Sequence, residues 1–230
     1  MARADSQGGG FTNGFASRLR LADGSRVFVK AVSSLQSPEV FASSAQEVRV
    51  ARALPRNVPA PRQRWTTEQD ESLVLACDDV SGRTPQRPWQ PEELRVVLDI
   101  LTPLAAVLTP VPAALPQLDT TADIDRDFSF WRRLAGGEEG TDPRLVSEQL
   151  RQHLGTLAAL EADGAALAAG ETAVHFDMRE DNLLLTGDGR ALACDWNRLS
   201  IAAPWVDWSG CSSASTVTGS TLKLFLPSTR

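Results

Sequence analysis

A set of polar residues with the spacing of a metal- and phosphate-handling site lies within residues 174–196. His175, Asp177 and Asn182 fit the pattern H-x-D-x-x-x-x-N, and Asp195 follows a later apolar run. Mg²⁺ prefers carboxylate, amide and phosphate oxygens, so Asn182 and Asp195 are candidate metal ligands. Asp177 is a candidate group to accept or orient the proton of an attacking hydroxyl. These are the residue types that phosphoryl transfer requires.

Two short apolar runs must hold these residues in place. Residues 182–186 and 191–194 have strand character, and the Gly-Asp-Gly turn at 187–189 between them is typical of a hairpin. A hairpin brings Asn182 and Asp195 to the same end, where they can act together. An ordinary solvated hairpin with acidic ends fits the same residues, because a single match to such a pattern arises easily by chance.

This loop pattern, followed by Asp195-Trp196 in place of Asp-Phe-Gly, resembles the aminoglycoside phosphotransferase family. The resemblance implies an α+β, bilobal, protein-kinase-like fold with a small, mainly β N-lobe and a mainly helical C-lobe. It implies ATP and Mg²⁺ as cofactors, and it places Arg179 where a cation faces the transferred phosphate. The expected division is a nucleotide-binding N-lobe at residues 1–79 and a C-lobe at residues 80–230.

A lysine and a glutamate in the N-lobe complete the expected phosphate site. Residues 26–32 have the β-branched and aromatic composition of a strand that contains Lys30. Residues 37–54 have helical periodicity, with Glu47 in the middle. The family resemblance implies that Lys30 binds the α- and β-phosphates and that Glu47 holds Lys30. The alternatives are an exposed strand lysine and a solvated helix glutamate.

Two further nucleotide contacts are expected from position. Gly9 and Gly10 belong to a glycine-rich turn whose backbone can approach phosphate closely, although glycine-rich termini are often only flexible. Ala76, Cys77 and Asp78 end an apolar strand where the family has its hinge, and adenine is expected to bind backbone groups there. A strand that ends at an acidic turn explains these three residues equally well. Because only seven residues precede the glycine run, we expect the first N-lobe strand to be missing or much shortened.

The C-lobe is expected to be mainly helical. Hydrophobic periodicity predicts helices at residues 91–108 and 123–135, and one long helix or two at 143–168. The family resemblance implies that Asp207, in a proline-containing segment, steadies the catalytic loop, and that His175 belongs to the same supporting set.

The residue pattern changes at Ser209. Residues 209–230 are rich in serine and threonine without a helical period, whereas the family continues with helices that wall the acceptor site. We therefore expect an atypical tail at 209–230, the absence of those helices, and a chain truncated at both ends. One hypothesis is that the tail results from a shifted reading frame, which sequencing the gene across the Trp208 codon would test.

Composition limits the class of protein. The chain has 230 residues, 42% of them hydrophobic, which is enough for one large domain or two small lobes. A net charge of -6 argues against a nucleic-acid partner. The three cysteines are far apart and show no metal-ligand spacing. No run approaches the roughly 20 apolar residues of a membrane span, so we expect a cytoplasmic protein without a membrane partner.

The leading hypothesis is an ATP- and Mg²⁺-dependent phosphotransferase that acts on a hydroxyl of a small molecule. The alternative is a catalytically impaired or inert remnant that at most binds nucleotide, which the short N-terminus and the unusual tail favour. Protein kinase activity is disfavoured because no Asp-Phe-Gly or Ala-Pro-Glu element follows the hairpin. The acceptor and the oligomeric state stay open.

Overall fold

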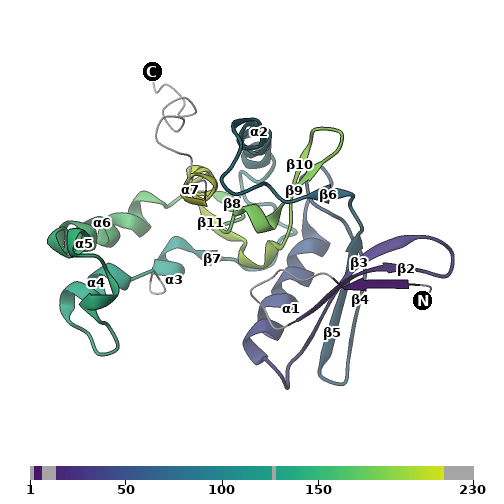
Figure 1. The fold of residues 1–230 in the computed structure, drawn as a ribbon, viewed down its shortest axis with the longest axis horizontal. Coiled ribbons are helices and arrows are strands. Elements are labelled where there is room, and N and C mark those ends of the chain that lie inside the picture. Colours follow the sequence, from purple (N-terminus) through teal and green to yellow (C-terminus); the bar gives the residue numbers. More distant parts are fainter. Residues whose placement is uncertain (1–2, 7–13, 126–127, 215–230) are drawn as a thin grey trace.

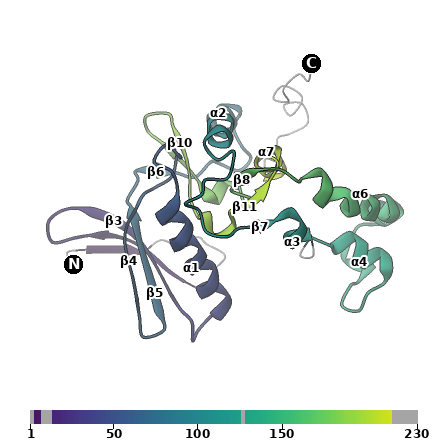
Figure 2. The same ribbon diagram turned by 180° about the vertical axis from the view of Figure 1, so that it is seen from behind.

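The structure, a computed structural model, describes residues 3–6, 14–125 and 128–214. An N-terminal sheet with one helix lies at one end of the molecule, and helices α4, α5 and α6 form an arm that extends from the opposite end (Figures 1 and 2). Short strands and the helices α2 and α7 lie between these two ends.

The N-terminal part is a five-stranded antiparallel sheet with the strand order β1-β2-β3-β5-β4. Its elements are β1 (Arg3–Ser6), β2 (Phe15–Arg20), β3 (Arg26–Ser33), α1 (Pro38–Ala53), β4 (Gln63–Gln69) and β5 (Ser72–Asp78). Proline in the first turn and Glu39 beside it suit the start of α1. The helix and the strands β3 and β5 therefore lie where the sequence predicts them.

The first N-lobe strand is not missing; it is present as a short strand of four residues, which agrees with the second expected alternative, a much shortened strand. Strand β1 pairs with β2 in antiparallel register, from Arg3 opposite Arg20 to Ser6 opposite Ser17. The sequence of β1, Arg-Ala-Asp-Ser, has no apolar alternation to reveal it. An edge strand can form through its backbone hydrogen bonds alone, so side-chain pattern is a poor guide at this position.

Two small sheets form the middle of the molecule. One has the order β10-β9-β6 and the other the order β7-β11-β8. Their strands are β6 (Gly82–Arg83), β7 (Asp119–Thr120), β8 (Thr172–Val174), β9 (Leu183–Thr186), β10 (Ala191–Ala193) and β11 (Ser200–Ala202). The antiparallel pairing of β9 with β10 confirms the predicted hairpin.

Strand β6 joins the segment after β5 to this hairpin. Gly82 lies opposite Thr186, and Arg83 lies opposite Leu185. A side chain at Gly82 would bring a Cβ to 3.0 Å from the carbonyl oxygen of Leu185. The close backbone approach therefore favours glycine at the point where the chain leaves the N-terminal sheet.

The helices of the remaining chain are mostly short. They are α2 (Pro91–Val107), α3 (Thr121–Asp125), α4 (Phe130–Gly136), α5 (Glu148–Gln152), α6 (Leu154–Leu167) and α7 (Trp205–Ala214), with 3₁₀ turns η1 (Pro143–Leu145), η2 (Glu180–Asn182) and η3 (Trp196–Arg198). None of the helices within the described ranges is long and apolar enough to cross a membrane.

Two helix predictions need correction and one is confirmed in its second alternative. The helix expected at 123–135 is two helices, α3 and α4, with Ser129 as the N-cap residue of α4. The segment 143–168 holds two helices, α5 and α6, with His153 between them, after a 3₁₀ turn at Pro143. The expected loss of helical structure at Ser209 is wrong, since α7 continues to Ala214. The rest of the predicted tail lies outside the described residues.

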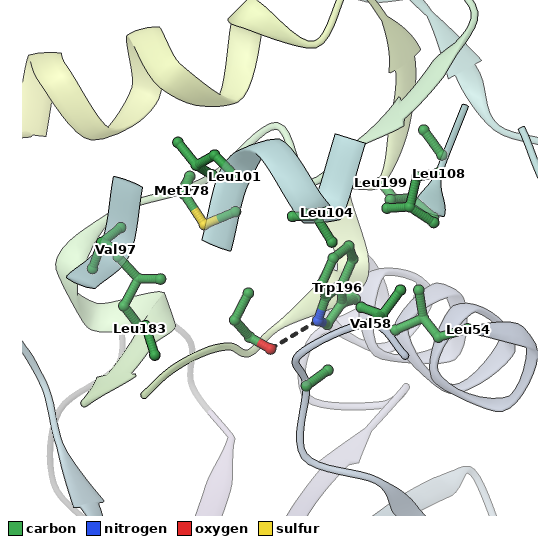
Figure 3. Packing of buried hydrophobic residues seen from close by; sticks show 14 of the residues in the cluster. Leu54, Val58, Val97, Leu101, Leu104, Leu108, Met178, Leu183, Trp196 and Leu199 are labelled. Carbon is green, nitrogen blue, oxygen red and sulfur yellow. Dashed lines mark hydrogen bonds between the residues drawn. The ribbon is translucent and has the colours of Figure 1, made fainter. Parts of the chain in front are cut away.

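One large core fixes α1 to the C-terminal part. Val50 of α1 and Leu54, the residue that follows the helix, belong to the same buried cluster as Leu101 and Leu104 of α2 and Trp196. Figure 3 shows Leu54 and Trp196 within this cluster. A helix buried in this way loses apolar contacts if it moves, so α1 is held against the elements that carry the polar residues of the predicted site.

Candidate active site

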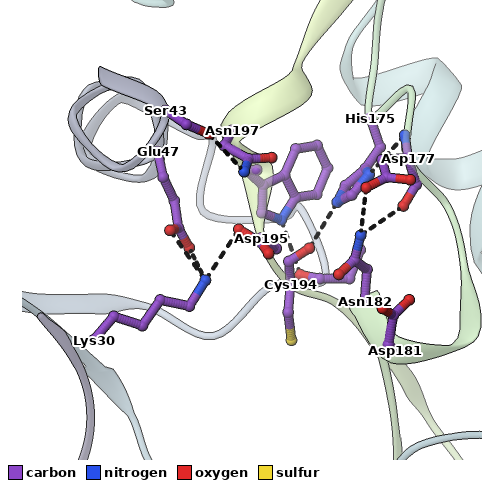
Figure 4. A network of polar contacts seen from close by, with 12 residues as sticks. Lys30, Ser43, Glu47, His175, Asp177, Asp181, Asn182, Cys194, Asp195 and Asn197 are labelled. Carbon is purple, nitrogen blue, oxygen red and sulfur yellow. Dashed lines mark hydrogen bonds and ion pairs between the residues drawn. The ribbon is translucent and has the colours of Figure 1, made fainter. Parts of the chain in front are cut away.

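Lys30 joins two carboxylates that come from opposite lobes. Its Nζ donates to Glu47 Oε1 and Oε2 at 2.8 and 3.0 Å and to Asp195 Oδ1 at 3.0 Å. Strand β3 supplies Lys30, α1 supplies Glu47, and Asp195 directly precedes η3 (Figure 4). The expected Lys30–Glu47 pair is therefore present, and Lys30 also reaches the candidate metal ligand.

Burial and charge act in opposite directions on this group. Burial alone would lower the pKa of Lys30, but Glu47 and Asp195 outweigh it and raise the pKa above its ordinary value. Burial raises the pKa of the Glu47 carboxyl, and the charge of Lys30 opposes that rise. Lys30 therefore stays protonated at neutral pH and can hold anionic groups between the lobes.

A second contact ties α1 to the segment after Asp195. Asn197 Nδ2 donates to Ser43 Oγ at 3.0 Å, across 154 positions of sequence. Ser43 lies one helical turn before Glu47, and Asn197 lies two residues after Asp195. Asp195 itself has a φ of 62°, a left-handed conformation that is uncommon outside glycine. The Ser43–Asn197 hydrogen bond and the ion pairs of Lys30 together fix Glu47 and Asp195 relative to each other.

The loop between β8 and β9, the expected catalytic loop, brings Asp177, Asn182 and Arg179 close together. Asn182 Nδ2 donates to the carbonyl oxygen of Asp177 at 2.9 Å and to Asp177 Oδ2 at 3.0 Å. Arg179 Nε lies 2.9 Å from Asp177 Oδ1, and Arg179 Nη2 donates to Asp181 Oδ2 at 3.2 Å. Asp177 is thus held by a neutral donor and by a cation at the same time.

His175 and Asp207 support this loop from behind. Asp207 accepts from the backbone N–H groups of His175 and Phe176 at 2.9 and 2.8 Å. The His175 ring is fully buried, lies 2.8 Å from the carbonyl oxygen of Cys194, and packs edge-to-face on Trp196. Burial raises the pKa of Asp207, against the lowering effect of His175 and the two N–H donors. The catalytic loop and the segment around Asp195 therefore share one support.

A cavity of about 540 Å³ lies between the lobes. Its lining includes Lys30, Glu47, Asp177, Arg179, Asn182 and Asp195. Its volume is within the range of about 300–1,000 Å³ that is usual for small-molecule and cofactor sites. The candidate polar residues thus face one common space.

The residues expected at the hinge differ in their access to this cavity. Cys77 and Asp78 line it, whereas Ala76 is fully buried in β5 between β3 and β4. The backbone N–H of Asp78 already donates to the carbonyl oxygen of Arg62 at 2.8 Å. Asp79 and Val80, which also line the cavity, come after the sheet pairing ends.

The glycine pair and the two cysteines near the cavity remain to be placed. Gly9 and Gly10 lie outside the described residues. Burial raises the pKa values of Cys77 and Cys194 to about 12, which keeps both thiols protonated at neutral pH.

The donor set fits Mg²⁺. Both hydrogen bonds of Asn182 Nδ2 go to Asp177, which leaves the amide oxygen as a possible ligand. Asp195 adds a carboxylate whose Oδ1 faces Lys30. Within the described ranges no cluster of three or more histidine, cysteine or acidic residues forms a complete metal site. Two oxygen-bearing side chains are the usual protein share of a Mg²⁺ site that nucleotide phosphates complete.

Ser43 and Asn197 were missed by sequence reasoning. Their contact is long-range, and neither residue type is unusual at its position. A signal for Lys30 was available and unused, since it is one of only two lysines in a chain rich in arginine.

A family model described as the phosphotransferase enzyme family matches residues 10–222. The chain belongs to this family. The match, together with the structural neighbours, confirms the resemblance to aminoglycoside phosphotransferases that the loop motifs predict. A comparison with curated proteins finds no match.

Solved structures of family members show the same fold. Choline kinase LicA from Streptococcus pneumoniae has a TM-score of 0.62 at 16% identity, over 98% of this chain and 74% of that chain. Aminoglycoside phosphotransferase APH(3'')-Id from Streptomyces rimosus has a TM-score of 0.57 at 21% identity, over 93% and 78%. A thermostable mutant of aminoglycoside phosphotransferase APH(4)-Ia, in a complex with ADP and hygromycin B, has a TM-score of 0.58 at 18% identity, over 91% and 71%. These similarities confirm the expected protein-kinase-like fold.

Proposed function

We propose that this family member transfers a phosphoryl group from ATP, with Mg²⁺, to a hydroxyl of a small molecule. The observation that carries the proposal is the network of Lys30, Glu47 and Asp195, which spans both lobes and lines the same cavity as Asp177 and Asn182. Positioning and charge stabilisation supply most of the rate enhancement in such sites.

The N-lobe side of the cavity would bind the nucleotide. Lys30, protonated and fixed by Glu47, would hold the α- and β-phosphates. Since the backbone of Asp78 is engaged within the sheet, adenine would meet free backbone groups from Asp79 onward, with Cys77 as a neighbouring wall. Solved neighbours in complexes with ADP or AMP-PNP support a nucleotide ligand for this cavity.

The C-lobe side would hold the metal and the reacting groups. Asn182 Oδ1 and the Asp195 carboxylate would bind Mg²⁺, which neutralises phosphate charge when bound. Asp177, kept in place by Asn182, would orient the acceptor hydroxyl and accept its proton. Arg179, now paired with Asp177, carries a guanidinium that suits a transferred phosphate.

The rival function is nucleotide binding without phosphoryl transfer. Its support is that α6, although rich in leucine and alanine, has no buried residue, with Leu160 and Leu167 61% and 65% exposed. An exposed apolar face of this kind usually needs a partner. Nucleotide binding without transfer to any acceptor would be its signature.

The direct test is transfer of labelled γ-phosphate from ATP to a panel of hydroxyl compounds that includes streptomycin, hygromycin B and choline. Asp177→Asn should reduce kcat by about 10²–10⁴-fold, because it removes the proton acceptor while leaving an amide of the same size. Asp188→Asn, in the exposed turn of the same hairpin, is the matched control. Nucleotide binding by the parent without label in any acceptor would favour the rival, and equal rates for parent and Asp177→Asn would remove Asp177 from the chemistry.

A further inference from the structure

The acceptor must approach Asp177 from the side opposite the nucleotide's leaving oxygen. In an in-line transfer, the attacking and leaving oxygens lie on opposite sides of the phosphorus. Asp177 lines the nucleotide cavity, whereas the preceding residue, Phe176, does not. The surroundings of Phe176 are therefore the first place to look for groups that recognise the acceptor, an inference that rests on the proposed function.

Phe176 has an unfavourable backbone conformation. Its φ is 66°, which glycine adopts readily and a bulky residue does not. The hydrogen bond from its N–H to Asp207 Oδ1, at 2.8 Å, helps to hold this conformation. Backbone strain of this kind concentrates at functional sites. Backbone geometry alone would favour glycine at position 176, so the presence of an aromatic side chain there calls for another explanation.

The ring contacts two groups from distant parts of the chain. Phe128, in the arm, packs edge-to-face on it with 5.7 Å between ring centroids. Arg198, at the end of η3, has its guanidinium carbon 5.8 Å from the centre of the Phe176 ring, a cation–π distance. The Phe176 ring therefore holds the Arg198 guanidinium beside the loop that carries Asp177.

Arg198 is available for a ligand. It is exposed, and the described residues provide it with no carboxylate within ion-pair distance. Arg179, by comparison, is shared between Asp177 and Asp181. A planar guanidinium with free donors, oriented by an aromatic ring, suits bidentate binding of a carboxylate or phosphate.

We propose that Arg198, held by the Phe176 ring on which Phe128 packs, is an anion subsite for the acceptor. The substrate class is a hydroxyl compound that carries a carboxylate or phosphate group close to the reacting hydroxyl. The positive charge disfavours polycationic acceptors, so hygromycin B and streptomycin, the ligands of two structural neighbours, should be poor substrates.

The test uses NMR of the arginine Nε–Hε groups in the full chain saturated with Mg-AMP-PNP. Glycerate, glycerol and choline are the probes, because they share a hydroxyl and differ in charge. Glycerate should shift the Arg198 resonance saturably, and glycerol and choline should not. The Arg198 signal is assigned by its absence in Arg198→Lys, and Arg95, exposed on α2, is the matched control resonance.

Two outcomes would overturn the subsite. One is an Arg198 resonance whose chemical shift does not change with glycerate, or changes in parallel with the chemical shift of the Arg95 resonance. The other is a resonance that Mg-AMP-PNP already saturates, so that glycerate adds nothing, because Arg198 would then bind the nucleotide. Phe176→Gly should relieve the strained backbone, keep the protein folded, and weaken glycerate binding about tenfold by releasing the guanidinium. Unchanged glycerate affinity in this folded variant would contradict the role of the ring.

The proposed function is checked on the same sample by calorimetry of Mg-AMP-PNP. Failure to bind nucleotide would count against the phosphotransferase proposal. A saturable response of Arg198 to glycerate without nucleotide would then still show an anion site, so the two failures can be told apart.

Discussion

At the scale of single residues, one lysine pairs with two carboxylates. Glu47 is buried, and the side chains of Lys30 and Asp195 are 29% and 36% exposed. Removing one partner of a buried pair is far more damaging than removing one of an exposed pair, because an unpaired charge stays buried. Lys30 therefore matters to the folded state as well as to the nucleotide.

Lys30→Met should destabilise the protein by about 2 kcal/mol at pH 8, between the costs of surface and buried pairs. The loss should be smaller at pH 5. Without Lys30, burial and the nearby Asp195 raise the pKa of Glu47 further above 4.5, its value in the unfolded chain. An acid with a raised folded pKa gives stability that is present at low pH and lost as pH rises through that pKa.

Urea unfolding at the two pH values measures this difference. Arg144→Ala, which breaks an exposed pair with Asp142, should change stability by less than about 1 kcal/mol at both. A Lys30→Met effect that is the same at pH 5 and pH 8 would mean that Glu47 is not the group that titrates.

At the scale of elements, the Ser43–Asn197 hydrogen bond connects α1 to the segment that carries Asp195. Ser43→Ala and Asn197→Ala should each weaken Mg-AMP-PNP binding, because Glu47 and Asp195 lose their fixed separation. The double variant should show a coupling energy of about 1 kcal/mol, the usual net value of one hydrogen bond. Calorimetry of Mg-AMP-PNP binding to the parent, the two single variants and the double variant measures this coupling energy.

Two further variants make this result specific. Ser43→Thr keeps the hydroxyl and should retain most of the affinity. Ser44→Ala combined with Asn197→Ala should be additive, since Asn197 bonds to the neighbouring serine. A coupling energy near zero for the Ser43 and Asn197 pair would show that the core alone positions α1.

Elements with a strong local sequence pattern, a β-branched run or a glycine-rich turn, could be predicted from the sequence. The β-branched run around Lys30 and the Gly-Asp-Gly turn gave β3 and the catalytic hairpin in their correct places. The edge strand β1 was not predictable in full, because it depends on pairing with β2 rather than on periodicity. The position of the break at His153 was not predictable either, although two helices were one of the expected alternatives. The Ser43 contact with Asn197 required the tertiary fold.

At the scale of the whole molecule, the cavity is built by parts that cannot move independently without breaking contacts. Helix α1 shares its core with α2, and β6 pairs the segment after the N-terminal sheet to β9. Lys30 and Asp195 also meet across the lobes. Because contacts within the chain hold these parts together, the proposed nucleotide site should be largely preformed, which lowers the ordering cost of binding.

The most direct measurement of the central claim is calorimetry of AMP-PNP binding with Mg²⁺ and with EDTA, for the parent, Asp195→Asn and the control Asp188→Asn. We predict that the parent and the control bind in a Mg²⁺-dependent manner and that Asp195→Asn binds at least about tenfold more weakly, since it removes a charged metal ligand. A folded parent that does not bind, or one whose affinity is unchanged by EDTA and by Asp195→Asn, would contradict a nucleotide–metal site between the two lobes.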